Sequence, residues 1–217
     1  MNWIISQKWE HACFLNFSIK KEELQKCLPK GFEVDTYSDL GWLSIVSFKM
    51  SQVRLAYLPT FPFSSLWELN LRTYVRYKNK PGIYFFSLDS SHFLANFIAR
   101  FFFHLPYRNK KIKSQMRLDG QTLSSVGDFE LDYKIGRKRE KTVFDSWITE
   151  RYCLFTKHKE QFFEGRVHHP SWELREVDNL KWSESLRTSF QLPNSADCDS
   201  SFYSKGFRVY FEPFKKI

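Results

Sequence analysis

One stretch decides the fold of this 217-residue chain: Trp67-Glu68-Leu69-Asn70-Leu71-Arg72-Thr73-Tyr74-Val75-Arg76-Tyr77. Successive side chains of a β-strand point to opposite faces, so the near-perfect alternation predicts a strand with two unlike faces. One face is formed by Trp67, Leu69, Leu71, Thr73, Val75 and Tyr77, and the other by Glu68, Asn70, Arg72, Tyr74 and Arg76. The sheet that contains this strand therefore shapes both the core and any polar site.

Other segments with strand character flank this stretch. The turn Asn79-Lys80-Pro81-Gly82 leads into Ile83–Leu88, and this arrangement predicts a β-hairpin. Residues 41–50 are apolar with hardly a break, which is typical of a strand covered on both faces. An apolar segment spans 11–19, and further strands are expected at 112–118, 128–135, 152–156, 162–168, 172–177 and 202–211.

Three helices are expected between these strands. The first covers 21–28 and ends at Pro29; the second begins after Ser90 or Ser91, with apolar residues at helical spacing from Phe93 to Phe101; the third covers 143–150. Many short strands with a few separated helices indicate an α+β, mainly antiparallel β architecture, most simply closed as a barrel or curled sheet. No repeat or linker divides the chain, so a single domain over 1–217 is expected.

Composition favours a sheet-based core, because aromatic residues make up 18% of the chain. The net charge of +9 is concentrated in two runs, 108–113 and 134–141. Such runs are usually solvated surface, and no helix-turn-helix, zinc-finger or RNA-binding signature accompanies them. Binding of nucleic acid is therefore unlikely.

The cysteines indicate a reduced compartment. Cys13, Cys27, Cys153 and Cys198 form no C-x-x-C pair, and the start of the chain lacks the pattern of a signal peptide. The most apolar stretch, 93–105, is too short to span a bilayer. A cytoplasmic protein without a membrane segment is expected. The absence of a P-loop and of a G-x-G-x-x-G motif predicts no nucleotide cofactor.

The polar face of residues 67–77 is the best candidate site. If it lines a closed sheet, Glu68, Asn70 and Arg72 would form a pocket for an anionic or carbonyl-bearing ligand. The alternative is a solvent-facing row on an ordinary amphipathic strand, and spacing alone favours that alternative.

Two other pairs of residues are of types that can bind a metal or act as a nucleophile. His168 and His169 are adjacent and would point to opposite faces of a strand, so no metal site is expected from them. Lys110-Lys111 is a weak candidate, since a lysine beside a second cation can titrate low enough to form a Schiff base.

Several ordered strings resemble the YqjF-like family of unknown function, a bacterial branch of the acetoacetate decarboxylase-like superfamily. They are Leu28-Pro29-Lys30-Gly31-Phe32-Glu33-Val34-Asp35, Trp67 to Val75, Lys80 to Asp89, His104-Leu105-Pro106-Tyr107, Thr149-Glu150-Arg151-Tyr152-Cys153-Leu154 and His168-His169-Pro170-Ser171-Trp172. The resemblance implies a β-barrel or cone with a central cavity and helices packed outside. It also implies that Glu68 matches a glutamate near the reactive lysine of the decarboxylases.

The reactive lysine is not at the matching position. Relatives that decarboxylate carry a Lys-Lys pair directly after a Gly-aromatic-Pro string, whereas here Tyr107 and Arg108 follow Pro106. Lys110-Lys111 lies three residues late, and an odd offset on a strand reverses the face. Decarboxylation is therefore not transferred, and whether the chain is an enzyme stays open.

Two functions follow as hypotheses. The first is a small-molecule-binding or lyase-like domain for a carboxylate or carbonyl compound. Arg72 would pair with the ligand's carboxylate, Glu68 would act as acid/base or anchor, and Asn70, Tyr74, Tyr107 and His168 would complete the site. The alternative is a non-catalytic interaction domain whose basic loops bind an anionic partner.

Overall fold

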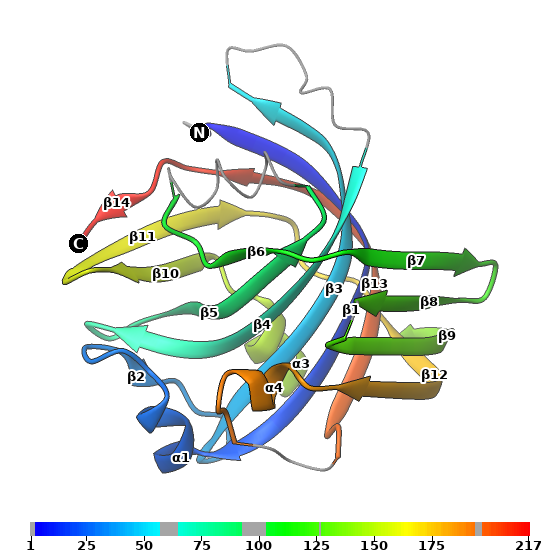
Figure 1. Ribbon diagram of the computed structural model, residues 1–217, viewed down its shortest axis with the longest axis horizontal. Coiled ribbons are helices and arrows are strands. Elements are labelled where there is room, and N and C mark those ends of the chain that lie inside the picture. Colours follow the sequence, from blue (N-terminus) through cyan, green and yellow to red (C-terminus); the bar gives the residue numbers. More distant parts are fainter. Residues whose placement is uncertain (1–2, 57–64, 93–102, 126, 194–196) are drawn as a thin grey trace.

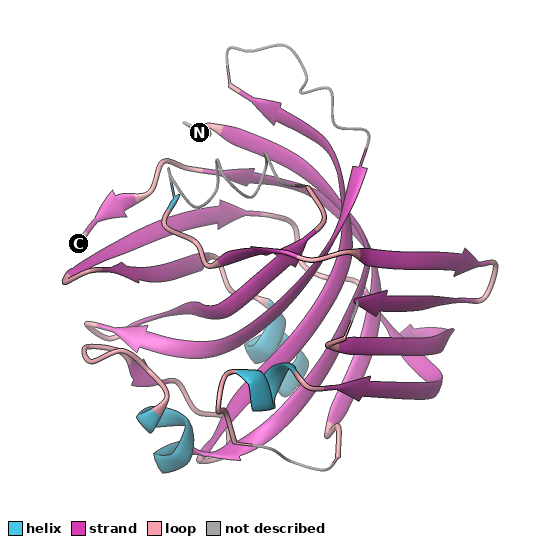
Figure 2. Cartoon of the chain, in the orientation of Figure 1, coloured by secondary structure: helices cyan, strands magenta, loops and turns pink. Residues whose placement is uncertain are grey.

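The computed structural model describes residues 3–56, 65–92, 103–125, 127–193 and 197–217, which form a large, mostly antiparallel sheet with short helices (Figures 1 and 2). The strands are β1 (Ile5–Lys20), β2 (Glu33–Val34), β3 (Leu40–Leu55), β4 (Ser65–Tyr77), β5 (Lys80–Ser90), β6 (Tyr107–Asn109), β7 (Ile112–Arg117), β8 (Gly120–Ser125), β9 (Phe129–Arg139), β10 (Cys153–His158), β11 (Gln161–His168), β12 (Leu174–Glu184), β13 (Ser200–Phe211) and β14 (Lys215–Lys216).

An extra strand pairing closes part of the sheet into a ring. Neighbouring strands run β14-β11-β10-β5-β4-β3-β1-β13-β12-β9-β8-β7, and β11 also pairs with β13 through Val167–Phe211 and His168–Tyr210. This extra pairing makes a ring of β11, β10, β5, β4, β3, β1 and β13. Strands β12, β9, β8 and β7 continue from β13 as an arm, at the right of Figure 1. The α+β, mainly antiparallel fold predicted from the sequence is confirmed.

Strand β4 shows both faces that its sequence predicts. It pairs antiparallel with β3 and β5, and every residue from Glu68 to Val75 is buried. The hairpin turn lies slightly earlier than expected, at Lys78-Asn79 rather than at 79–82. Both turn residues have positive φ (48° and 67°), the conformation that a two-residue type I′ hairpin requires and that asparagine tolerates well.

The two faces of β4 belong to different hydrophobic layers. Leu69, Leu71 and Val75 pack in an outer layer with residues of α1 and of the β8–β9 arm, such as Leu24 and Leu131. An inner layer inside the ring is formed by residues that include Phe14, Val46, Phe48, Ile83, Phe85, Leu154, Trp172 and Phe202. The polar face of β4 therefore points into the ring, where water is scarce.

Three helices lie among the described residues: α1 (Lys21–Lys26), α3 (Val143–Thr149) and α4 (Leu186–Ser189). Helix α3 begins at a capping box, in which the Thr142 hydroxyl accepts from the Asp145 N–H and the Asp145 carboxylate accepts from the Thr142 N–H, both at 3.0 Å. Helices α1 and α3 match the expected positions. The helix expected from Phe93 lies outside the described residues, and α4 and β8 were not predicted. In the part of the chain described, no helix is long and apolar enough to cross a membrane.

A buried carboxylate joins the α3 region to the sheet. Asp35, 3% exposed, follows β2 and accepts hydrogen bonds from Arg151 Nη1 (2.7 Å) and Arg76 Nε (2.8 Å). Arg151 is itself buried and donates from Nε to the Trp147 carbonyl at the end of α3 (2.7 Å). A buried guanidinium needs its counter-ion, since an uncompensated charge in the interior is costly.

We expect Asp35→Asn to lower the free energy of unfolding by about 3 kcal/mol, because it leaves the Arg151 cation buried without a carboxylate. The matched control is Asp119→Asn, which removes an exposed pair with Lys134 (3.1 Å) and should leave the free energy of unfolding nearly unchanged. Urea unfolding followed by tryptophan fluorescence measures both. Equal losses in the two variants would contradict the structural role of Asp35.

Candidate functional site

A cavity of about 60 Å³ lies inside the ring. All seven ring strands contribute to its wall, together with β6, α3 and the loops that follow α3 and β11. This volume has room for a few water molecules or a ligand of a few non-hydrogen atoms. Its lining comprises Gln7, Trp9, Phe14, Val46, Phe48, Glu68, Asn70, Arg72, Ile83, Phe85, Leu88, Leu105, Tyr107, Thr149, Arg151, Leu154, Val167, His169, Trp172 and Phe211.

Glu68 is the acidic group of the cavity. It is 3% exposed; its Oε2 accepts from the Tyr107 hydroxyl at 2.7 Å, and its Oε1 lies 3.5 Å from Asn70 Nδ2. Burial raises the pKa of Glu68 to about 7, although the hydrogen bonds from Tyr107 and Asn70 act in the opposite direction. Both protonation states of this carboxyl are therefore populated near neutral pH.

Arg72 is one of two arginines among the described residues that line the cavity, and it is 8% exposed. Its Nη2 lies 3.5 Å from the Tyr74 hydroxyl, and its guanidinium carbon lies 5.3 Å from the centre of the Phe14 ring. Within the described ranges, Arg72 forms no ion pair, and its buried Nε has no hydrogen-bond partner. A buried guanidinium without an anion is costly, so this group is prepared to receive one.

Other lining residues also carry polar atoms without partners. Asn70 Oδ1, Trp9 Nε1 and Arg151 Nη2 are buried and lack a hydrogen-bond partner among the described residues. Native interiors contain few such atoms, and each calls for a specific reason. With Arg72 Nε they make four unpartnered polar atoms, three donors and one acceptor, on residues that line one cavity.

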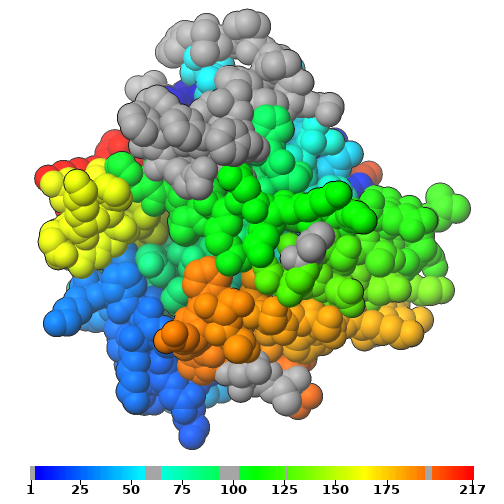
Figure 3. Space-filling model, viewed as in Figure 1, coloured from blue at the N-terminus to red at the C-terminus, as the bar shows by residue number. Residues whose placement is uncertain are grey.

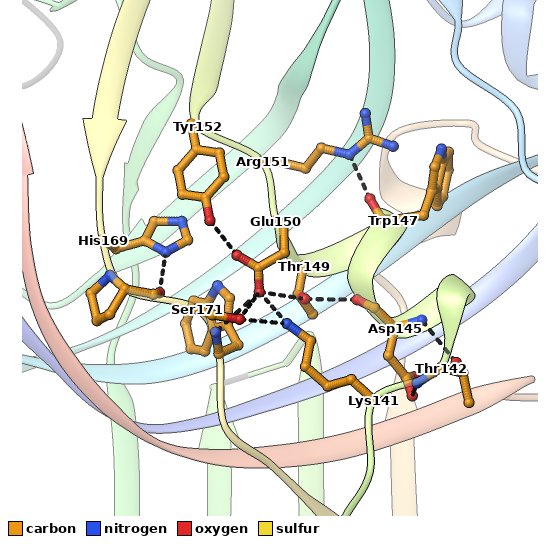
Figure 4. A network of polar contacts seen from close by, with 12 residues as sticks. Lys141, Thr142, Asp145, Trp147, Thr149, Glu150, Arg151, Tyr152, His169 and Ser171 are labelled. Atoms are coloured by element: carbon orange, nitrogen blue, oxygen red, sulfur yellow. Dashed lines mark hydrogen bonds and ion pairs between the residues drawn. The ribbon is translucent and has the colours of Figure 1, made fainter.

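The loops next to α3 form one wall of the cavity, and Figure 4 shows the polar contacts that connect them. Glu150 holds them together: its carboxylate accepts from Lys141, Tyr152, Ser171 and the Trp172 N–H. Although burial alone would raise it, the hydrogen bonds from Lys141 and Tyr152 lower the pKa of Glu150. These hydrogen bonds fix the chain on either side of Arg151 and at Trp172, and both of these residues line the cavity.

His169 completes that wall. Its Nδ1 lies 2.8 Å from the Pro170 carbonyl oxygen, and its ring stacks on Phe207 with centroids 5.1 Å apart. Burial lowers the pKa of His169, so the imidazole is neutral at neutral pH. The Tyr152 ring covers it from outside at a centroid distance of 4.5 Å.

The structure brings together four of the predicted site residues, namely Glu68, Asn70, Arg72 and Tyr107, and places the others elsewhere. Tyr74 is fully buried behind Arg72 and does not line the cavity. His168 Nε2 lies 2.7 Å from Glu212 Oε1, outside the cavity, so the histidine at the cavity is His169.

The lysine pair also lies away from the cavity. Lys110 forms an ion pair with Asp128 (2.5 Å), and the neighbouring Lys111 is exposed. None of the lining residues is a lysine. A Schiff base needs a lysine nucleophile. The described residues that line the cavity provide none, so the geometry does not support the Schiff-base hypothesis.

Carboxylates partner many charges of the two basic runs. In the first run, Arg108 donates twice to the buried Asp89, at 2.6 Å each. In the second, Arg137 pairs with Glu176 (2.8 Å) and Arg139 with Asp145 (2.9 Å). In Figure 3 the green segments around residues 105–135 lie across the middle of the visible face, next to the orange segment around residues 175–190. The geometry gives the alternative of a basic partner-binding surface no support.

Sequence reasoning missed Trp9, Thr149, Arg151 and His169 as lining residues. Arg151 and His169 lie outside regular elements, so no periodicity assigned them to a face. A weak signal was present, because both occur in strings that carried the family resemblance. No cluster of three or more His, Cys, Asp or Glu suited to a metal occurs in the described ranges.

Comparison with known sequences finds two matches. The sequence profile of DUF2071, described as "Uncharacterized conserved protein", matches residues 6–208. The uncharacterized protein YqjF of Bacillus subtilis (strain 168) is 38% identical over 186 residues, which cover 81% of this chain and 77% of YqjF.

Solved structures share the fold at low sequence identity. The enduracididine biosynthesis enzyme MppR complexed with pyruvate has a TM-score of 0.72 at 10% identity, covering 100% of this chain and 91% of MppR. Acetoacetate decarboxylase from Legionella pneumophila has a TM-score of 0.70 at 12% identity, covering 98% of this chain and 86% of the enzyme. The acetoacetate decarboxylase-like fold predicted from the residue strings is confirmed.

We expect the stability difference between Glu68→Gln and the wild type to depend on pH. In the folded wild type the Glu68 carboxyl keeps its proton up to about pH 7. In the unfolded chain it loses that proton near its ordinary pKa of 4.5. Wild-type stability therefore falls as pH rises from about 4.5 to about 7, and glutamine, which does not titrate, escapes this loss.

Urea unfolding at pH 5 and pH 8 measures the effect. The advantage of Glu68→Gln over the wild type should be larger at pH 8, by up to about 3 kcal/mol. A difference that is the same at both values would mean that Glu68 titrates as an ordinary carboxyl.

Proposed function

Since this chain belongs to the DUF2071 family and has the fold of acetoacetate decarboxylase-like proteins, we propose that its cavity binds a small carboxylate or carbonyl compound. The observation that carries the proposal is Arg72, a buried guanidinium in the cavity wall with no carboxylate partner among the described residues. An arginine fork matches the two oxygens of a carboxylate and forms its strongest hydrogen bonds to charged acceptors.

The size and surface of the cavity restrict the ligand. About 60 Å³ holds a molecule of a few non-hydrogen atoms, and the wall away from the polar groups is formed by apolar side chains such as Phe48, Phe85 and Leu154. A compound with one carboxylate and a short apolar or carbonyl-bearing part fits these features. One of the structural neighbours is complexed with pyruvate, a compound of this kind.

Glu68 gives the cavity a group for moving protons. With a pKa of about 7 it can donate a proton in one state and accept one in the other. The Tyr107 hydroxyl holds Oε2, so the orientation of the carboxyl is set before a ligand arrives. In the proposed role, Glu68 transfers a proton to or from a carbonyl compound whose carboxylate rests on Arg72.

For the binding step, we expect small carboxylates, pyruvate among them, to raise the melting temperature of the wild type and not of Arg72→Met. A ligand at about 100 times its Kd stabilises the folded state by about 2.7 kcal/mol. Without ligand, Arg72→Met should be at least as stable as the wild type, because an apolar side chain of similar volume replaces a buried unpaired charge. The control, Arg137→Met, removes an exposed guanidinium and should respond as the wild type does. Identical shifts in all three proteins would exclude the cavity as the carboxylate site.

For the proton-transfer step, we expect the wild type to accelerate exchange of the pyruvate methyl hydrogens with D₂O. A positioned general base contributes on the order of 10²- to 10⁴-fold, so Glu68→Gln should lose at least about 10²-fold of the acceleration. Proton NMR of pyruvate over time measures the exchange. Binding that persists without any acceleration would limit the function to binding.

A further inference from the structure

A chain of buried hydrogen bonds runs from Arg72 away from the cavity. Arg72 Nη2 contacts the Tyr74 hydroxyl at 3.5 Å, and this hydroxyl lies 2.7 Å from Ser44 Oγ. Ser44 Oγ lies 2.7 Å from Asn16 Oδ1, and Asn16 Nδ2 lies 3.2 Å from the Ser200 carbonyl oxygen. Ser44, Tyr74 and Asn16 are each 0% exposed. The chain crosses from β4 through β3 and β1 to β13, which are neighbours in the ring.

The direction of each hydrogen bond follows from the groups themselves. The Ser200 carbonyl only accepts, so the Asn16 amide turns its NH₂ towards it and presents its oxygen to Ser44. A hydroxyl has one proton, and that of Ser44 is used on Asn16 Oδ1. The Tyr74 hydroxyl must therefore donate to Ser44, which leaves its oxygen to accept from Arg72.

Tyr74 also contacts both cavity arginines through its ring. The guanidinium carbons of Arg72 and Arg151 lie 5.8 Å and 5.4 Å from the ring centre. A cation over an aromatic ring is stabilised most when the pair is withdrawn from bulk solvent, and both Tyr74 and Arg72 are buried. Tyr74 thus supports the two guanidinium groups of the wall without lining the cavity itself.

We propose that Tyr74, Ser44 and Asn16 are positioning residues that fix the orientation of the Arg72 guanidinium through its Nη2, while its Nε keeps no partner in the described part of the chain and is left for the ligand's carboxylate. The inference rests on the proposed function and adds the residues that prepare the site. Without the chain, the guanidinium would rotate among several orientations, and binding would have to select one of them. Ordering a long side chain in advance raises affinity by removing that cost from the binding step.

The test uses four variants of the whole chain and two measurements. Tyr74→Phe removes the acceptor for Arg72, Ser44→Ala breaks the chain one step further away, and a third variant combines both. Thr73→Val is the matched control: it removes an equally buried hydroxyl of β4, which donates to the Trp42 carbonyl at 2.8 Å and takes no part in the chain. Calorimetric titration with pyruvate gives affinity, and NMR of the Arg72 guanidinium gives its rotation.

We expect Tyr74→Phe to weaken pyruvate binding about fivefold and Ser44→Ala about two- to threefold, the size of a lost hydrogen bond or less. The double variant should bind no more weakly than Tyr74→Phe, because a chain already broken at Tyr74 gains nothing from Ser44. Thr73→Val should bind as the wild type does. The Arg72 resonances should show faster rotation in Tyr74→Phe and not in Thr73→Val.

The outcomes separate this inference from the proposed function. If Arg72→Met abolishes binding while Tyr74→Phe keeps both wild-type affinity and slow guanidinium rotation, the site stands and the positioning chain is overturned. Multiplicative losses in the double variant would also overturn it, since they indicate independent packing effects. If pyruvate does not bind the wild type, the proposed carboxylate function loses its support. The positioning role of Tyr74 is then tested by guanidinium rotation alone: equal rotation of Arg72 in the wild type and Tyr74→Phe would overturn it.

Discussion

Closure of the sheet imposes the constraint on which the other features depend. Once β11 pairs with β13, the polar face of β4 has no access to bulk water, and Glu68, Asn70 and Arg72 must find partners inside the ring. Part of that need is met by Tyr107 and Tyr74. The part that is not met, the unpartnered Nε of Arg72 above all, is the basis of the proposed binding site. The candidate site thus results directly from the burial of a strand face that carries charged groups.

The family relationship and the cavity contribute different parts of the argument. The fold is shared with acetoacetate decarboxylase at 12% identity, a level at which architecture persists and chemistry need not. In this chain the described lining contains two arginines and one glutamate, and no lysine. The described lining therefore supports the proposed electrostatic site for a carboxylate, with Glu68 as its titrating group, better than a covalent one.

Local pattern predicted the elements and a barrel or curled sheet, but it did not identify the strands whose pairing closes the ring. The alternation in residues 67–77 specified a strand, its hairpin partner and the side on which Glu68 and Arg72 lie, since these depend on neighbours along the chain. Whether that side faces water or a cavity depends on the pairing of β11 with β13, which are far apart in sequence; only the family resemblance favoured the cavity. Arg151 and His169 reach the site from loops, whose side chains follow no period. The choice between two adjacent histidines was likewise set by the point at which β11 ends, at His168.

Because β4 is buried on both faces, its odd-numbered and even-numbered positions are subject to different constraints. Odd-numbered positions such as Leu69 and Leu71 pack against the outer layer, whereas Glu68, Asn70 and Arg72 touch only the interior of the ring and its contents. Exchanges at the even-numbered positions can remodel what the cavity accepts while the outer packing stays as it is. If the proposed site is right, Glu68, Asn70 and Arg72 offer protein engineers three neighbouring positions at which ligand selectivity can be altered without repacking the outer layer.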